Sequence, residues 1–143
     1  MSKQPTADET INALVVEIRI LESTYNELSA RQNLLERALV ENRAALDALT
    51  GLGDKPQQEV LMQIGGGAFL HSPPPSTDKV LVSVGANVVI EKPKAKAVAL
   101  LEDRSRDVEK TVMSIAGQRN ELAQRLNSDR QVLNSLVSRQ SED

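Results

Sequence analysis

The chain has 143 residues and a formal net charge of −3, with one Phe, one Tyr, no Trp and no Cys. The absence of cysteine excludes disulfides and cysteine-ligated metals, and the absence of a basic stretch argues against nucleic acid as a partner. Because aromatic side chains dominate the energetics of ordinary cores, their scarcity favours a thin aliphatic seam between long helices.

The N-terminal third of the chain predicts one long helix. Thr6 followed three residues later by Glu9 is typical of a capping box at a helix start, and Gly51 and Gly53 are stop signals. Apolar residues between them recur every seven positions without a skip, which predicts a coiled-coil helix. The seam comprises Ile11, Ile18, Tyr25, Gln32, Leu39 and Leu46, with Leu14, Leu21, Leu28, Leu35, Asn42 and Leu49.

Residues 54–93 form an insert with the alternating apolar pattern of β-strands. The first hairpin is expected to pair residues 60–64 with 68–71 through a turn at 65–67, where three glycines permit positive φ. Pro73, Pro74 and Pro75 then end the ladder because proline donates no backbone hydrogen bond. A second hairpin is predicted from the strands at 80–84 and 88–90.

Both predicted hairpins carry apolar residues on both strand faces. A lone two-stranded hairpin is marginal in water, and unpaired edges of this composition aggregate. We therefore expect strands from several chains to close into a β-barrel. The residues expected to carry subunit assembly are Val60, Met62, Ile64, Phe69, Val80, Val82, Val84, Val88 and Ile90.

A second long helix is predicted from Pro93, a favoured first helical residue, to about residue 138. Its heptad seam matches the first in length, which favours an antiparallel coiled-coil hairpin. The seam comprises Val98, Ser105, Val112, Arg119, Leu126 and Leu133, with Leu101, Val108, Ile115, Leu122, Asp129 and Leu136.

The expected fold is therefore α+β in a single domain over residues 1–143: a long antiparallel coiled-coil hairpin at residues 6–52 and 93–138, with two β-hairpins inserted at its base. Placing Asn42 opposite Ser105 puts two polar seam residues in one layer, and a buried polar residue can fix register, whereas a slip of one heptad would place Asn42 opposite Val98 or Val112. The same register places Leu28 opposite Arg119 and Ile18 opposite Asp129, which we expect to loosen the distal half.

The far end of this coiled coil carries apolar residues that no further layer covers. They either close the seam or bind a partner, and the two valines, which lie off the seam, favour binding. These tip residues are Ile11, Leu14, Val15, Leu133, Leu136 and Val137.

The order of helix, two hairpins and helix resembles the prefoldin family. Residues 78–87, DKVLVSVGAN, resemble the second-hairpin signature of the α-type subunit found in archaea, and residues 61–69, LMQIGGGAF, are similar to its first-hairpin turn. The resemblance implies a hexamer of two α and four β-type subunits, with a double β-barrel and six projecting coiled coils. It further implies that the tips hold unfolded polypeptide and deliver it to a group II chaperonin without nucleotide.

No catalytic constellation is recognisable in the sequence. His71 is the only histidine, and a lone histidine near a strand end is better explained as exposed or structural. The sequence contains no nucleophile elbow, phosphate-binding loop or paired metal-ligating histidines. We therefore predict no enzyme activity, no cofactor and no metal.

Two other functions remain open from the sequence: a structural coiled-coil oligomer or filament spacer without client binding, and a coiled-coil arm that grips RNA. The charge balance argues against the second. The N-terminal residues lack the apolar run of a signal peptide, and no stretch reaches the ~20 apolar residues of a membrane helix. We therefore expect a cytoplasmic protein with no membrane partner.

Overall fold

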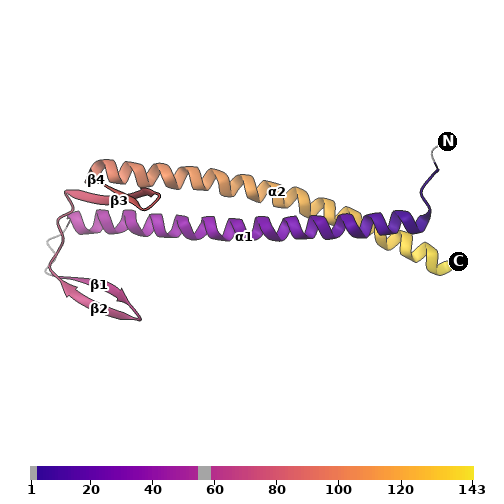
Figure 1. Cartoon of the computed structure of the whole chain (residues 1–143), viewed down its shortest axis with the longest axis horizontal. Helices are drawn as coiled ribbons and strands as arrows, with labels where there is room; N and C mark the ends of the chain where they lie inside the picture. The colour runs from indigo at the N-terminus through magenta and orange to yellow at the C-terminus, as the bar shows by residue number, and fades with distance from the viewer. Residues whose placement is uncertain (1–2, 55–58) are drawn as a thin grey trace. The chain divides into compact units, whose positions relative to one another are not determined.

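The computed structural model describes residues 3–54 and 59–143, and it contains two long helices with two antiparallel hairpins between them (Figure 1). This confirms the predicted element order. Residues 55–58 of the insert and the first two residues of the chain lie outside the described residues. The elements are α1 (Ala7–Asp54), β1 (Val60–Gly65), β2 (Ala68–Ser72), β3 (Lys79–Gly85), β4 (Val88–Pro93) and α2 (Lys94–Glu142).

The start of α1 carries the predicted capping box. The Thr6 N–H donates to Glu9 Oε2 at 3.0 Å, and the Glu9 N–H donates to Thr6 Oγ1 at 3.3 Å. These two bonds satisfy donors that the first helical turn leaves without intrahelical acceptors.

The helix ends differ from the sequence prediction at three places, one of which is the end of α2 at Glu142 instead of about residue 138. Helix α1 continues through both predicted stop signals, Gly51 and Gly53, to Asp54, because each glycine costs only about 1 kcal/mol in a helix and Leu52 extends the half-buried seam. Pro93 is the last residue of β4, paired with Lys79, and α2 begins one residue later. The Lys94 N–H, free at the helix start, donates to the Asp78 carbonyl at 3.1 Å.

The chain divides into two compact units, which are described separately. The terminal unit comprises Met1–Glu36 with Lys110–Asp143, and the hairpin unit comprises Arg37–Glu109. In each unit every predicted seam position is buried or half-buried, polar positions included. The heptad pattern therefore identified the face that each helix buries.

The core of the terminal unit lies in the seam between α1 and α2. Its buried residues are Ile18, Leu21 and Leu126, with Tyr25, Leu122 and Leu133 packed against them. The ends of the two helices also meet, because Gln140 Nε2 donates to Asp8 Oδ1 at 2.6 Å. The two helices are therefore antiparallel in this unit, as predicted.

Each hairpin turns through two central residues with positive φ. These are Gly66 and Gly67, at 59° and 75°, and Ala86 and Asn87, at 50° and 60°, values typical of type I′ turns. A β-bulge precedes each turn, since the register shifts between Gln63 and Gly65 and again between Ser83 and Gly85.

The second bulge corrects one sequence prediction. Alternation along the predicted strand 80–84 places Val84 on the same face as Val80 and Val82, but Val84 is the extra residue of the bulge and leaves the alternation. Accordingly Val82 is 5% exposed and Val84 is 45% exposed.

Candidate functional site

The six predicted tip residues all lie in the terminal unit, on the first turns of α1 and the last turns of α2. Ile11, Leu14, Val15, Leu133 and Leu136 are half-buried, so the seam partly covers them. Val137 is 49% exposed. Of the six, Val137 therefore presents the most surface to a partner.

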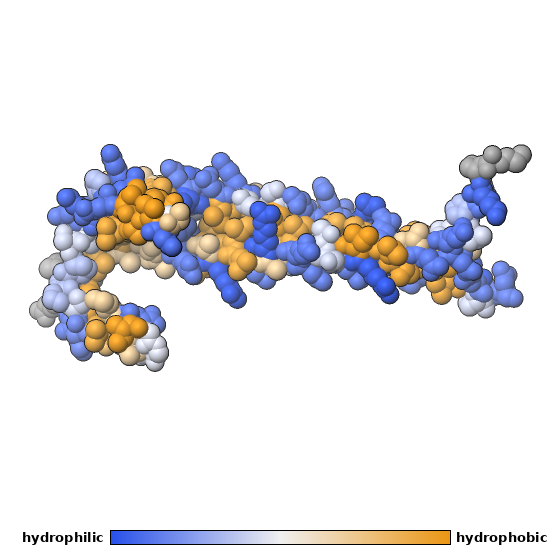
Figure 2. Space-filling view, in the orientation of Figure 1, coloured by the Kyte–Doolittle hydropathy of each residue, from blue (hydrophilic) through white to orange (hydrophobic). Residues whose placement is uncertain are grey.

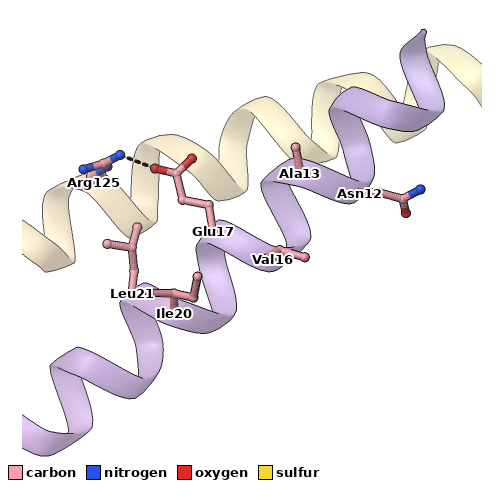
Figure 3. A pocket seen from close by; sticks show the side chains of 7 residues that line it. All are labelled: Asn12, Ala13, Val16, Glu17, Ile20, Leu21 and Arg125. Carbon is pink, nitrogen blue, oxygen red and sulfur yellow. Dashed lines mark hydrogen bonds and ion pairs between the residues drawn. The ribbon is translucent and has the colours of Figure 1, made fainter. Parts of the chain in front are cut away.

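An apolar groove on the same unit was missed by sequence reasoning. Val16 and Ile20 of α1 are 55% and 60% exposed, and their spacing of four residues places them on one helix face. The sequence shows that neither residue is needed by the heptad seam, but it does not show that both stay exposed. The groove is lined by Asn12, Ala13, Val16, Glu17, Ile20, Leu21 and Arg125 (Figure 3).

An ion pair between the two helices borders this groove. Glu17 reaches across to Arg125 of α2 and forms an ion pair (Figure 3). Such an exposed pair contributes little to stability, but it places polar groups beside the apolar residues of the groove. The arrangement suits transient contact with apolar side chains better than chemistry on a bound substrate.

The seam of the terminal unit also contains a polar layer. Arg119 donates to Gln32 Oε1 at 2.8 Å and to the Tyr25 hydroxyl at 3.0 Å. Residues 25 and 32 lie about one helical turn on either side of Leu28. These contacts agree with the predicted register, which placed Leu28 opposite Arg119.

Two buried polar atoms lie at polar seam positions of this unit, one in this layer and one in the layer of Asp129. Arg119 Nε and Asp129 Oδ2 have no hydrogen-bond partner among the described residues. A buried polar atom without a partner lowers stability. Two predicted weak layers therefore contain uncompensated polar atoms.

The hairpin residues predicted for assembly fall into different environments. Val82 is buried, and Val60, Val80 and Ile90 are half-buried. Met62, Ile64, Phe69, Val84 and Val88 are at least 45% exposed. Figure 2 shows hydrophobic residues gathered on both hairpins.

The pairing register also separates residues that the prediction grouped together. Met62 pairs with Leu70, whereas Phe69 pairs with Gln63 and so lies on the opposite face. The assembly residues predicted from the sequence leave out four further exposed apolar residues of the same strands, although the alternation along each strand assigns every one of them to a strand face. They are Leu61, Leu70, Leu81 and Val89.

The described residues offer no site for metal chemistry. They contain no group of three or more histidine, aspartate or glutamate side chains that could hold a metal ion. His71 lies in β2, is exposed, and contacts Glu59. Over its described residues, neither helix has a stretch long and apolar enough to cross a membrane.

Comparison with known proteins agrees with this architecture. A family model described as "Prefoldin subunit" matches residues 21–139. A prefoldin subunit alpha of Nitrosopumilus maritimus is 28% identical over 131 residues, covering 92% of this chain and 90% of that subunit. The alpha subunit of Methanoculleus marisnigri is 33% identical over 108 residues, covering 71% and 72%.

A solved structure gives the same result. The filamentous PFD from Methanocaldococcus jannaschii is similar with a TM-score of 0.51 and 26% sequence identity, over 85% of this chain and 95% of that chain. The helix–hairpin–hairpin–helix order, the heptad seams and these matches along most of the sequence lead to one conclusion. The chain belongs to the prefoldin family and resembles its archaeal alpha subunits.

Proposed function

We propose that this chain is an ATP-independent chaperone subunit that captures unfolded polypeptides at its helix ends and delivers them to a group II chaperonin. The observation that carries the proposal is the exposed apolar surface of the terminal unit, which the coiled-coil seam does not use. The exposed large apolar residues of this unit are Val16, Ile20, Leu34, Met113, Val132 and Val137, each at least 49% exposed.

Small apolar surfaces of this kind support a multivalent mechanism. Each one binds an apolar segment weakly, and several acting together raise the overall affinity without new contacts. Release needs no nucleotide, because each weak contact exchanges freely. A charged border such as Glu17 with Arg125 keeps the apolar surface hydrated at its edge.

The partners in this proposal follow from the hairpins. Their exposed apolar residues on both strand faces, including Leu61 and Met62 at 63% and 52% exposure, require cover from other chains. We propose that two copies of this chain assemble with four β-type prefoldin subunits into a cytoplasmic hexamer, with the hairpin strands closing a β-barrel.

A second candidate is a structural filament subunit that binds no client. It is supported by the similar solved structure, which is described as a filamentous PFD. The two candidates differ in whether the exposed surface of the terminal unit matters for activity.

Suppression of aggregation of a chemically unfolded protein separates these candidates. The assembled complex is compared with complexes that carry Val15→Ser and Val137→Ser, or Ile11→Ser and Leu136→Ser, and the mass of each complex is measured first. A chaperone loses suppression while the mass stays unchanged. A filament spacer either does not suppress aggregation in its parent form or suppresses it equally in the parent and in all variants.

A further inference from the structure

Helix α1 of the terminal unit carries a second apolar stripe on the side opposite its seam. Each residue of this stripe lies two positions after a seam residue, which is about 200° around the helix. We call it the outer stripe; it runs from residue 13 to residue 34, and every residue in it is exposed. Its apolar members are Ala13, Val16, Ile20, Ala30 and Leu34.

The corresponding face of α2 has no such stripe. A helix face that meets only solvent is expected to be polar, and this face of α2 is. The apolar outer stripe of α1 therefore indicates that a further partner packs on this helix. Between residues 114 and 135, the positions of α2 that lie two after each seam residue are all exposed and hold Gly117 and six polar residues: Ser114, Glu121, Gln124, Ser128, Gln131 and Ser135.

The polar residues of the outer stripe indicate what that partner is. Ser23 and Glu27 lie at its centre, with the apolar residues on either side. Two copies of the stripe that run antiparallel, with a two-fold axis beside residue 25, bring Ser23 of each copy opposite Glu27 of the other, where the hydroxyl can donate to the carboxylate. A parallel pair would place the two Glu27 side chains together, and such a like-charge contact is unfavourable.

The same antiparallel alignment matches the apolar residues of the two copies. Val16 of each copy lies opposite Leu34 of the other, and Ile20 lies opposite Ala30, so apolar layers flank the polar centre on both sides. A slip of one heptad in either direction would place Val16 or Leu34 opposite a polar residue. The pattern of the stripe therefore specifies one register with a second copy.

Charges beside the stripe also fit a second copy. Glu17 and Arg31 flank the stripe on the same side, each four residues after a stripe position. In the antiparallel pair, Arg31 of each copy lies two residues, or about 3 Å along the axis, from the position opposite Glu17 of the other. One oxygen of Glu17 contacts Arg125 of its own chain, and the second oxygen can accept a hydrogen bond from Arg31 of the other copy.

We propose that the outer stripe of α1 binds the outer stripe of a second copy of this chain in antiparallel orientation. The contact is about 32 Å long and contains five apolar residues from each copy, so it is a weak contact that depends on concentration. The pairing goes beyond client capture and does not depend on it. Because it covers Val16 and Ile20, it closes the groove of the terminal unit while two arms are paired.

Disulfide trapping tests this contact, because the chain contains no cysteine. Full-length Ile20→Cys and Ala30→Cys chains with different tags are mixed and oxidised. A disulfide requires Cβ atoms about 3.5–4.5 Å apart, so we expect at least tenfold more linked heterodimer than from Ile20→Cys mixed with Ser128→Cys, which lies on the outer face of α2. Ile20→Cys by itself should not link, because the two copies of residue 20 lie about 15 Å apart along the axis.

A charge reversal tests the choice of partner. Arg31→Glu, added to both cysteine chains, places like charges beside Glu17 of the other copy and should lower the yield of heterodimer at least threefold. Arg31 is exposed, so the fold of the chain should not change.

Four outcomes overturn the inference. Preferential linkage of Ile20→Cys to itself would show parallel pairing, and equal linkage to Ser128→Cys would show random collision. An unchanged yield with Arg31→Glu would show that the charges do not select a second copy. If the cysteine chains do not link while the parent chain captures unfolded protein, that protein is the occupant of the stripe. The aggregation assay with the parent chain tests the proposed function separately from all four.

Discussion

The guanidinium of Arg119 lies over the ring of Tyr25, with its central carbon 4.8 Å from the ring centroid and Nη2 donating to the phenolic oxygen at 3.0 Å. The two residues occupy seam positions of α2 and α1, where an apolar layer would be expected. Tyr25 therefore offers Arg119 both a cation–π contact and an acceptor. This compensation is incomplete, because the buried Arg119 Nε has no partner among the residues described.

Replacing Arg119 with leucine should stabilise the coiled coil. Apolar residues of similar volume often equal or exceed a buried charged group in stability, so we expect a gain of about 1 kcal/mol in unfolding free energy, roughly 3 °C in midpoint. Tyr25→Ala should instead destabilise by about 2 kcal/mol, because it leaves a desolvated guanidinium with fewer partners. Thermal unfolding followed by far-UV circular dichroism measures both, and a lower midpoint for Arg119→Leu would contradict the explanation.

Client capture should depend on the groove of the terminal unit. Val16→Ser and Ile20→Ser each remove apolar surface worth about 1 kcal/mol of binding, or about fivefold in dissociation constant per residue. Both side chains are more than half exposed, so the stability of the chain should change by less than about 0.5 kcal/mol. Fluorescence anisotropy with a labelled unfolded protein gives the dissociation constant.

Val40→Ser is the matched control for these two variants. Val40 is 65% exposed, also on α1, but belongs to the hairpin unit. It should bind the unfolded protein as the parent chain does. An equal loss of binding in all three variants would show that general surface hydrophobicity, and not the groove, governs capture.

The seam and the hairpins were predictable because local patterns determine them. Every seam position predicted from the seven-residue period is buried or half-buried in the structure, including polar ones such as Gln32 and Ser105. Paired strands on either side of Gly65–Gly67 identified the first hairpin. In both cases the burial or the turn depends on residues close in sequence.

The structural features that could not be predicted from the sequence depend on contacts between distant residues. The exposures of Val82 and Met62, 5% and 52%, differ although the two strands have the same alternation of residues. The bulge at Val84 follows from cross-strand register. Predicting the groove at Val16 and Ile20 requires knowing that the neighbouring helix leaves both side chains exposed.

Two glycines allow a matched test of backbone conformation. A Cβ added at Gly85 or at Gly117 would meet nothing within 4 Å, but Gly85 has φ of +100° and Gly117 lies inside α2. Gly117→Ala should therefore stabilise by about 1 kcal/mol, and Gly85→Ala should destabilise by at least about 1 kcal/mol. Chemical denaturation of the two variants measures the difference, and a stabilising Gly85→Ala would show that the bulge conformation is not required.

The packing of β3–β4 on α2 should be sensitive to side-chain size at Ala97. Ala97 is 0% exposed, so Ala97→Leu has no room for its added atoms and should destabilise by about 1–3 kcal/mol. Because the hairpin can move away from the helix more easily than the helix can bend, we expect faster amide hydrogen exchange in β3, at Val82 above all, with α2 unchanged. Ala99→Leu, at an exposed position two residues away, should leave exchange in β3 as it is. Equal exchange in the two variants would mean that the cover of Ala97 does not come from the hairpin.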